Sequence, residues 1–393
     1  MAINKSKILA LTGFYFQGLI QGIAFTTIPA AAGFLTSQSG FALDTLQYGS
    51  LYLPMILGAI LACFTAGVVG KKVGIRVPLL VGLTLNSVAM AGFALCSLLM
   101  HSPAQAFMAL LAVMLAIGLG FGALLTALNS YALFFFPKGS KTAITFLHTC
   151  LGVGTALGPL LFDVFYTRDC FWGDPLLISF LFFVLLISAL IFFPNPMQFG
   201  QERKTQGKVR NRPLFLLFLA IAFFYGVSET AFGNWGTLFL TRSKGFNLID
   251  ANFALALFWA AVTAGRLAAA FLSLKLSFKA IYRILSPILL CSVLLLLFAS
   301  KSQQLYVAFA MAGLGCSAFL PFTVGLAQER FAAIAPVISG LVMGIYMAGY
   351  GVVSQGVGVL SELFHLSLSA LFAFLIFVCV LLFYLILKVT KER

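Results

Sequence analysis

The chain has 393 residues, of which 62% are apolar and 9% charged, whereas soluble globular proteins carry about 45–50% and about 25%. The mean hydropathy is +1.08, and long apolar stretches recur from one end of the chain to the other. This composition excludes a soluble domain and favours a polytopic membrane protein. The formal net charge of +14 would suggest a nucleic-acid partner in a soluble protein, but here the positions of the basic residues explain it differently.

Stretches without Asp, Glu, Lys or Arg mark the candidate spans, because a helix needs about 20 residues to cross a hydrocarbon core of ~30 Å. Two of these stretches are interrupted by one charged residue each, Glu229 and Arg266. The stretch 77–137 is long enough for two crossings and breaks at His101-Ser102-Pro103, so we predict twelve spans. The stretches are 8–43, 45–70, 77–137, 142–162, 175–201, 213–241, 251–274, 284–300, 302–328, 331–361 and 363–387.

The distribution of Lys and Arg between the spans predicts the orientation. With a cytoplasmic N-terminus, nineteen of these residues lie inside and four outside, and Arg266 remains within a span. Both termini are therefore expected in the cytoplasm, and the net charge reflects this bias together with attraction to anionic lipid. We expect a multi-pass monomer in the inner (cytoplasmic) membrane of a bacterium, in contact with the lipid bilayer and with no nucleic-acid partner.

A polar segment after the sixth span divides the chain into two halves. We predict an N-terminal six-helix bundle at 1–193, a cytoplasmic central loop at 194–212 and a C-terminal bundle at 213–393. Internal similarity supports a duplication, because four residues in or beside spans four and five recur at a constant offset of 195. They are Gly118, Gly120, Phe136 and Gly154, repeated as Gly313, Gly315, Phe331 and Gly349. Such repeats place a substrate site near mid-membrane between the halves.

Several motifs resemble the major facilitator superfamily. Gly67–Arg76 is similar to the family's loop signature of glycine, acid, base, glycine and base, with Lys71 in the place of the acid. Leu147–Pro159 and Gly313–Pro321 resemble the fifth and tenth helices of the fucose permease branch, and Glu229 followed by Gly233-Asn234-Trp235 resembles its seventh. The resemblance implies an all-α integral membrane fold of two pseudo-symmetric six-helix bundles, and a transporter that works by alternating access.

This resemblance has consequences for the gate and for the substrate. It implies gating roles for Lys72, Gly74 and Arg76, while Lys71 removes the acid on which inner-gate charge pairing would depend. The acids that handle protons and sugar in fucose permease lie in its first and fourth helices, where this sequence has none. That difference argues against fucose as the substrate.

Ionisable residues at membrane depth are costly and mark transport pathways. Glu229 lies ~24 Å along its helix from Pro213 and shares a face with Tyr225, so it is either a protonatable, substrate-binding gate or a structural partner. His148 is either a proton shuttle or an interhelical hydrogen-bond former. Arg266 is a candidate for anchoring the inner gate, for an anion or substrate ligand, or for snorkelling, and it lies too far towards the cytoplasm to pair readily with Glu229.

Polar and aromatic side chains on shared helix faces are the candidate substrate ligands. Helix-to-helix hydrogen bonding or packing is the alternative for each of them. Trp235 would stack on a ring of the solute or belong to an interfacial belt. The candidates are Gln17, Gln21, Thr126, Asn129, Tyr225, Asn234, Trp235, Tyr346 and Tyr350.

The sequence contains no HExxH, Walker P-loop or GxSxG motif, so neither a metalloprotease nor an ATP-driven pump is supported, and no cofactor is expected. We predict a secondary active transporter for a small polar solute, sugar-like or another metabolite, coupled to protons through Glu229 and in part His148. A proton-antiporting exporter of drugs or metabolites and a uniporter remain open. A transporter-like receptor without flux is the alternative from another class, and substrate-dependent counterflow would separate it from a transporter.

Overall fold

The computed structural model describes residues 5–197, 211–331 and 335–391, and every regular element in these ranges is a helix. Among the described residues, twelve helical spans are long and apolar enough to cross a membrane. This agrees with the twelve spans predicted from the sequence. Most of the central loop predicted at 194–212 lies outside the described residues.

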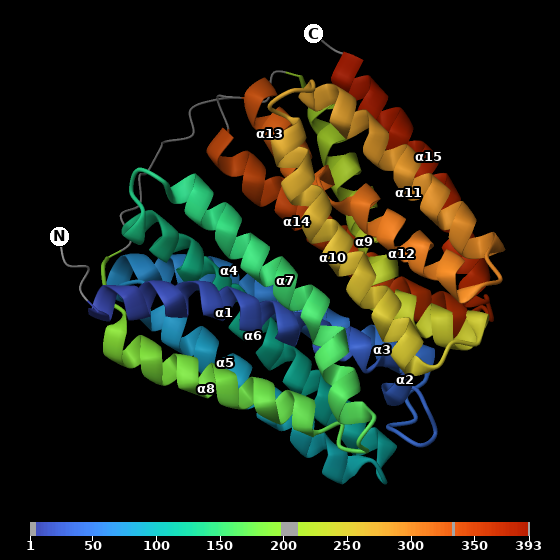
Figure 1. The fold of residues 1–393 in the computed structure, drawn as a ribbon, viewed down its shortest axis with the longest axis horizontal. Helices are drawn as coiled ribbons and strands as arrows, with labels where there is room; N and C mark the ends of the chain where they lie inside the picture. The colour runs from blue at the N-terminus through green and yellow to red at the C-terminus, as the bar shows by residue number, and fades with distance from the viewer. Residues whose placement is uncertain (1–4, 198–210, 332–334, 392–393) are drawn as a thin grey trace. The chain divides into compact units, whose positions relative to one another are not determined.

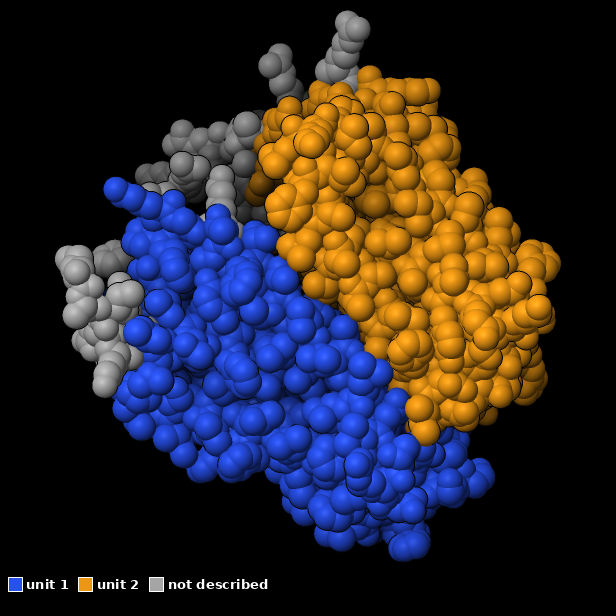
Figure 2. Space-filling model, in the orientation of Figure 1, with its two compact units in different colours: residues 1–201 blue, residues 202–393 orange. Residues whose placement is uncertain are grey.

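The chain divides into two compact units, residues 1–201 and 202–393, which Figure 2 colours separately. The helices of the first unit are α1 (Lys5–Ala30), α2 (Ala32–Leu35), α3 (Thr45–Ser50), α4 (Tyr52–Val73), α5 (Arg76–Leu95), the 3-10 helix η1 (Cys96–Leu99), α6 (Pro103–Phe135), α7 (Ser140–Tyr166) and α8 (Gly173–Phe192). Those of the second are α9 (Arg212–Lys244), α10 (Leu248–Leu272), α11 (Phe278–Phe298), α12 (Ser302–Cys316), α13 (Phe319–Arg330), α14 (Ala335–Leu363) and α15 (Leu368–Lys391).

Local sequence accounts for several helix ends. Asp44 and Gln47 form a capping box on α3, with the Asp44 carboxylate accepting from the Gln47 amide at 2.6 Å. Asn211 caps α9, and Gly245, with a φ of +71°, ends it in the left-handed conformation. α9 extends from Arg212 to Lys244. The charged residues near its two ends limit the apolar stretch, but they do not end the helix.

The repeated glycines make equivalent contacts in the two units. A Cβ at Gly118 of α6 would lie 2.0 Å from a carbonyl of α4, and one at Gly313 of α12 would lie 2.2 Å from a carbonyl of α10. Likewise, a Cβ at Gly154 of α7 would lie 2.0 Å from a carbonyl of α1, and one at Gly349 of α14 2.2 Å from a carbonyl of α9. Figure 1 shows α1 alongside α7. The repeat therefore preserves close backbone approaches, which only a residue without a Cβ permits.

Three spans are made of more than one helix, and one of these is the third, in which α5 continues into η1. The tenth divides into α12 and α13 at Ser317 and Ala318, and the second begins with the short helix α3. In the seventh, Gly233 and Gly236 leave α9 unbroken: a Cβ at Gly233 would lie 2.9 Å from the ring of Trp259, and one at Gly236 2.7 Å from that of Phe309. Because these two glycines have no side chain, the neighbouring rings pack directly against the helix.

Candidate functional site

The side chain of Glu229 lies inside the second unit and is 5% exposed. Its Oε1 accepts a hydrogen bond from Tyr225, one turn earlier on α9, at 2.6 Å. Its Oε2 accepts a hydrogen bond from Tyr346 on α14. Both carboxylate oxygens are therefore held by phenol hydroxyls, and one of these comes from a different helix.

Aromatic rings enclose this carboxylate. The ring of Tyr225 stacks on that of Tyr346 at 5.4 Å between centroids, and on that of Phe319 of α13 at 5.5 Å. α9 and α14 approach closely here, because Gly226 carries no side chain: a Cβ there would lie 2.3 Å from the carbonyl oxygen of Tyr346. The close approach brings both tyrosines within hydrogen-bond reach of Glu229.

A second hydrogen-bonded group continues along the same two helices. Asn234 of α9 donates through Nδ2 to the hydroxyl of Tyr350 at 2.7 Å and to that of Ser354 at 3.2 Å, and Tyr350 donates to Asn234 Oδ1 at 3.0 Å. All three side chains are buried. The two groups form what we call the α9–α14 polar cluster: Tyr225, Glu229, Asn234, Tyr346, Tyr350 and Ser354.

The structure also places Trp235 and Arg266 in the second unit. Trp235 is fully buried, so its assignment to an interfacial belt is wrong. Arg266 of α10 donates through Nε to the carbonyl of Ser317, at the break between α12 and α13, at 3.1 Å. Arg266 therefore links α10 to the break in the tenth span.

The amides predicted on the first span lie inside the first unit. Gln17 and Gln21 of α1 are fully buried, and Gln21 Oε1 accepts from Asn86 Nδ2 of α5 at 2.8 Å. Neither amide atom of Gln17 has a hydrogen-bond partner among the described residues. Gln21 thus has an interhelical partner, whereas Gln17 keeps its hydrogen-bonding capacity for a ligand or for water.

The remaining candidates of the first unit lie on α6 and α7. The side chains of Thr126 and Asn129 are half-buried on α6, and the Oδ1 of Asn129 has no hydrogen-bond partner in the described part of the chain. His148 is half-buried on α7. None of these three contributes to the α9–α14 polar cluster, which consists only of residues of the second unit.

The predicted gating residues lie around the turn from α4 to α5: Lys72 in the last turn of α4, Gly74 in the turn itself and Arg76 at the start of α5. Gly74 has a φ of +97°, and a Cβ there would lie 2.1 Å from Oδ1 of Asn195, so this turn requires glycine. Asn195 Oδ1 accepts from the backbone amide of Arg76 at 3.1 Å, and the guanidinium of Arg76 donates to the carbonyl of Leu190 on α8. Lys72 is exposed. Asn195, which follows the end of α8, therefore holds the turn between α4 and α5 by hydrogen bonds.

Sequence reasoning missed four residues of these groups. Asn86 and Asn195 are neutral and have no periodic partner, so only their contacts distinguish them. Ser354 continues the face of Tyr346 and Tyr350 at the next i+4 position, and that spacing was the available signal. Asp174, in the first turn of α8, is fully buried, and neither of its carboxylate oxygens has a hydrogen-bond partner among the described residues. Its position just before the charge-free stretch that begins at 175 was the available signal, because it placed the acid at a membrane boundary.

Comparison with known proteins shows which protein family this chain is similar to. The family model of the Major Facilitator Superfamily matches residues 14–333. Membrane protein MosC of Rhizobium meliloti is 24% identical over 325 residues, 81% of this chain and 75% of the relative. An uncharacterized MFS-type transporter of Yersinia pestis is 24% identical over 368 residues, 91% of this chain and 89% of the relative.

Solved structures show the same fold at lower sequence identity. A mutant form of the nucleoside transporter NupG superposes with a TM-score of 0.79 at 13% identity, over 98% of this chain and all of that one. At this identity the likeness concerns the fold of the helices alone.

Proposed function

The chain belongs to the major facilitator superfamily and is a membrane transporter rather than an enzyme, and we propose that it is a secondary active transporter for a small polar solute. In this proposal it works by alternating access, with proton coupling through Glu229. The observation that carries the proposal is the buried carboxylate of Glu229, bound by tyrosines from two helices. Ionisable groups at this depth serve transport pathways, because their burial has a cost that function must offset.

The hydrogen bonding of Glu229 indicates how one proton would alter the α9–α14 polar cluster. As a carboxylate it accepts from both Tyr225 and Tyr346. Once protonated it becomes a donor at one oxygen, and the tyrosine at that oxygen must turn its own hydroxyl elsewhere. Since Tyr346 lies on α14, a proton on Oε2 of Glu229 changes a hydrogen bond between two helices. The hydroxyl of Tyr346 can then form a hydrogen bond with a polar solute.

The proposed ligands are neutral amides and phenols, which suits a polar, uncharged solute that carries hydroxyl or amide groups. Tyr346, Tyr350 and Asn234 supply these groups in the second unit. The neighbouring rings of Tyr346 and Tyr350, 6.5 Å apart between centroids, also offer flat apolar surfaces to the face of a ring. We therefore propose sugars and other ring-containing metabolites as the first solutes to test.

The test begins with a thermal-shift screen of purified protein against hexoses, disaccharides and nucleosides, because binding stabilises the folded state. For the most stabilising solute, pH-driven uptake and counterflow are then measured in the same proteoliposomes. Glu229→Gln keeps the shape of the protonated side chain but cannot cycle a proton, so we expect counterflow to persist and pH-driven accumulation to disappear. Glu329→Gln, at an exposed position of α13, is the matched control. Accumulation by Glu229→Gln equal to that of the control would refute the coupling role.

A further inference from the structure

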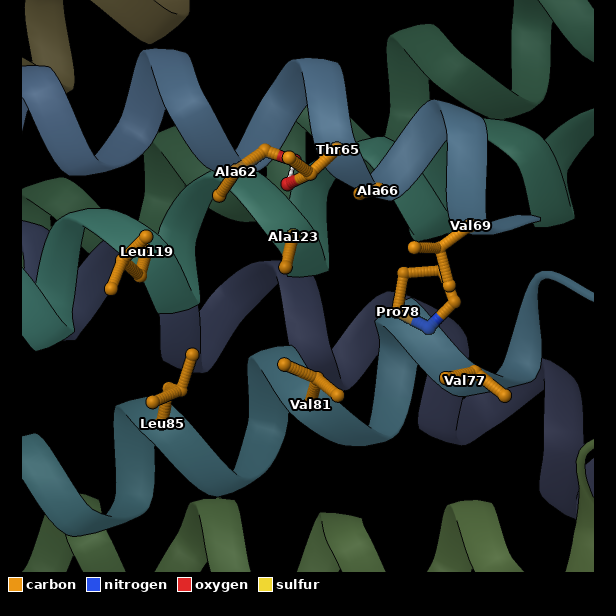
Figure 3. Close-up of a pocket in the computed structure, with 10 residues that line it drawn as sticks. All are labelled: Ala62, Thr65, Ala66, Val69, Val77, Pro78, Val81, Leu85, Leu119 and Ala123. Atoms are coloured by element: carbon orange, nitrogen blue, oxygen red, sulfur yellow. Dashed lines mark hydrogen bonds between the residues drawn. The ribbon is translucent and has the colours of Figure 1, made fainter. Parts of the chain in front are cut away.

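An apolar groove of about 130 Å³ lies on the first unit between α4 and α5, with α6 as its floor (Figure 3). Ala62 and Ala66 of α4 and Ala123 of α6 are buried and form the deepest part. α4 and α5 pack mainly on α6 rather than on each other. The small side chains and the separation of the two helices leave a space that the protein itself does not fill.

The groove is open and takes an apolar occupant. Val81, on the α5 wall, is 47% exposed, and Thr65, on the α4 wall, is also exposed. The hydroxyl of Thr65 donates to the carbonyl of Leu61 on its own helix at 2.9 Å, so its hydrogen-bonding need is already met. A polar ligand would lose its hydration in this groove and gain few hydrogen bonds in exchange, whereas a hydrocarbon chain has no such hydration to lose.

The groove is short enough to lie within one membrane leaflet. Its α5 wall runs from Val77 to Leu85, which is ~12 Å along a helix and shorter than half of a ~30 Å hydrocarbon core. It begins at the turn between α4 and α5, which the distribution of basic residues assigns to the cytoplasmic side. The occupant is therefore a chain of the cytoplasmic leaflet.

A basic residue stands at the headgroup end of the groove. Ala62, Ala66 and Val69 follow one another along one face of α4, and Lys72 continues that face one turn further. Lys72 is exposed, and Lys71, equally exposed, falls off this face. The cytoplasmic end of the groove is thus followed, one turn further along α4, by the exposed ammonium group of Lys72.

We propose that this groove binds one anionic phospholipid, with an acyl chain between α4 and α5 and the phosphate on Lys72. The bound chain packs against both helices where they do not pack on each other. The lipid thereby braces the α4–α5 hairpin next to the turn that contains Gly74.

The experiment measures lipid retention by native mass spectrometry of the full-length protein in detergent. Phosphatidylglycerol is compared with phosphatidylcholine of identical acyl chains. Val81→Trp fills the groove from an exposed position, and we expect it to lower retention of phosphatidylglycerol by at least about tenfold. Val88→Trp is the matched control, because Val88 is 61% exposed on the same helix and does not line the groove. Equal retention by the two variants would overturn the site, and Thr65→Phe, from the opposite wall, replaces Val81→Trp if that variant folds poorly.

The headgroup assignment has its own pair of variants. Lys72→Gln should lower retention of phosphatidylglycerol by about fivefold and that of phosphatidylcholine much less, since the choline ammonium already neutralises the phosphate charge that Lys72 would bind. Lys71→Gln should leave both unchanged. Equal effects of Lys72→Gln and Lys71→Gln would refute the aligned contact. Wild-type protein that retains both lipids equally would refute the selectivity for an anionic headgroup.

Discussion

Tyr346 on α14 donates a hydrogen bond to Glu229 on α9, across 117 residues of chain. Tyr225 supplies the second donor from the same helix as the carboxylate. Packing of α9 on α14 therefore includes a hydrogen bond that depends on the protonation of one side chain. The following predictions test this relationship and the contacts around it.

Tyr346→Phe should lower the stability of the protein, because it leaves one buried oxygen of Glu229 without a donor. The expected cost is about 1–3 kcal/mol, read as a lower Tm in detergent. Tyr384→Phe, 54% exposed on α15, is the control and should leave Tm unchanged. In a Glu229→Gln background the effect of Tyr346→Phe should shrink, since the two residues contact each other. Strictly additive effects would contradict the coupling.

Arg266→Lys should impair transport almost as much as Arg266→Ala, by about tenfold or more in initial uptake rate. Arginine holds the Ser317 carbonyl through Nε, and lysine cannot reproduce its planar fork of donors. Arg212→Lys, at an exposed helix start, provides the comparison. Normal uptake by Arg266→Lys would show that charge alone suffices at this position.

Gly349→Ala should destabilise the second unit, because its Cβ would lie 2.2 Å from the carbonyl oxygen of Phe223. We expect a loss of about 1–3 kcal/mol, typical of overpacking. Gly356→Ala on the same helix meets no neighbouring atom within 4 Å and should be neutral or slightly stabilising. Thermal denaturation followed by size-exclusion chromatography compares the two, and similar profiles would contradict the close approach of α9 and α14.

Asp174→Asn should preserve or raise stability, because neither oxygen of this fully buried carboxylate has a hydrogen-bond partner among the described residues. The first turn of α8 offsets part of the burial cost, so the expected gain is at most ~1–3 kcal/mol. Asp169→Asn is the control, since Asp169 lies in the exposed turn before α8 with a φ of +53°, which asparagine tolerates. A clear fall in Tm for Asp174→Asn alone would show that the charge itself is needed.

Cysteine reporters at 201–208, in a background without the seven native cysteines, should react only with reagents applied from the cytoplasm. The five basic residues of the central loop and the overall bias of basic residues require this orientation. Labelling from the outside would reverse the assignment of both termini, and with it the leaflet proposed for the lipid groove.

The number of spans follows from the order of residues alone, because hydrophobic length and charge spacing are properties of contiguous segments. The sequence also identified Glu229 with Tyr225, since residues four apart share a helix face. The contacts of Gly118 and Gly313, and of Gly154 and Gly349, follow the detected repeat because each pair occupies equivalent helices.

The helix that supplies the partner of each polar side chain, by contrast, is set by how the helices pack. Tyr346 meets Glu229, Tyr350 meets Asn234 and Gln21 meets Asn86 because helices distant in the chain cross at points set by packing. The break at Ser317 and the burial of Asp174 depend in the same way on the helices around them. Spacing along one helix determines which residues share a face, and the crossing of helices determines what that face contacts.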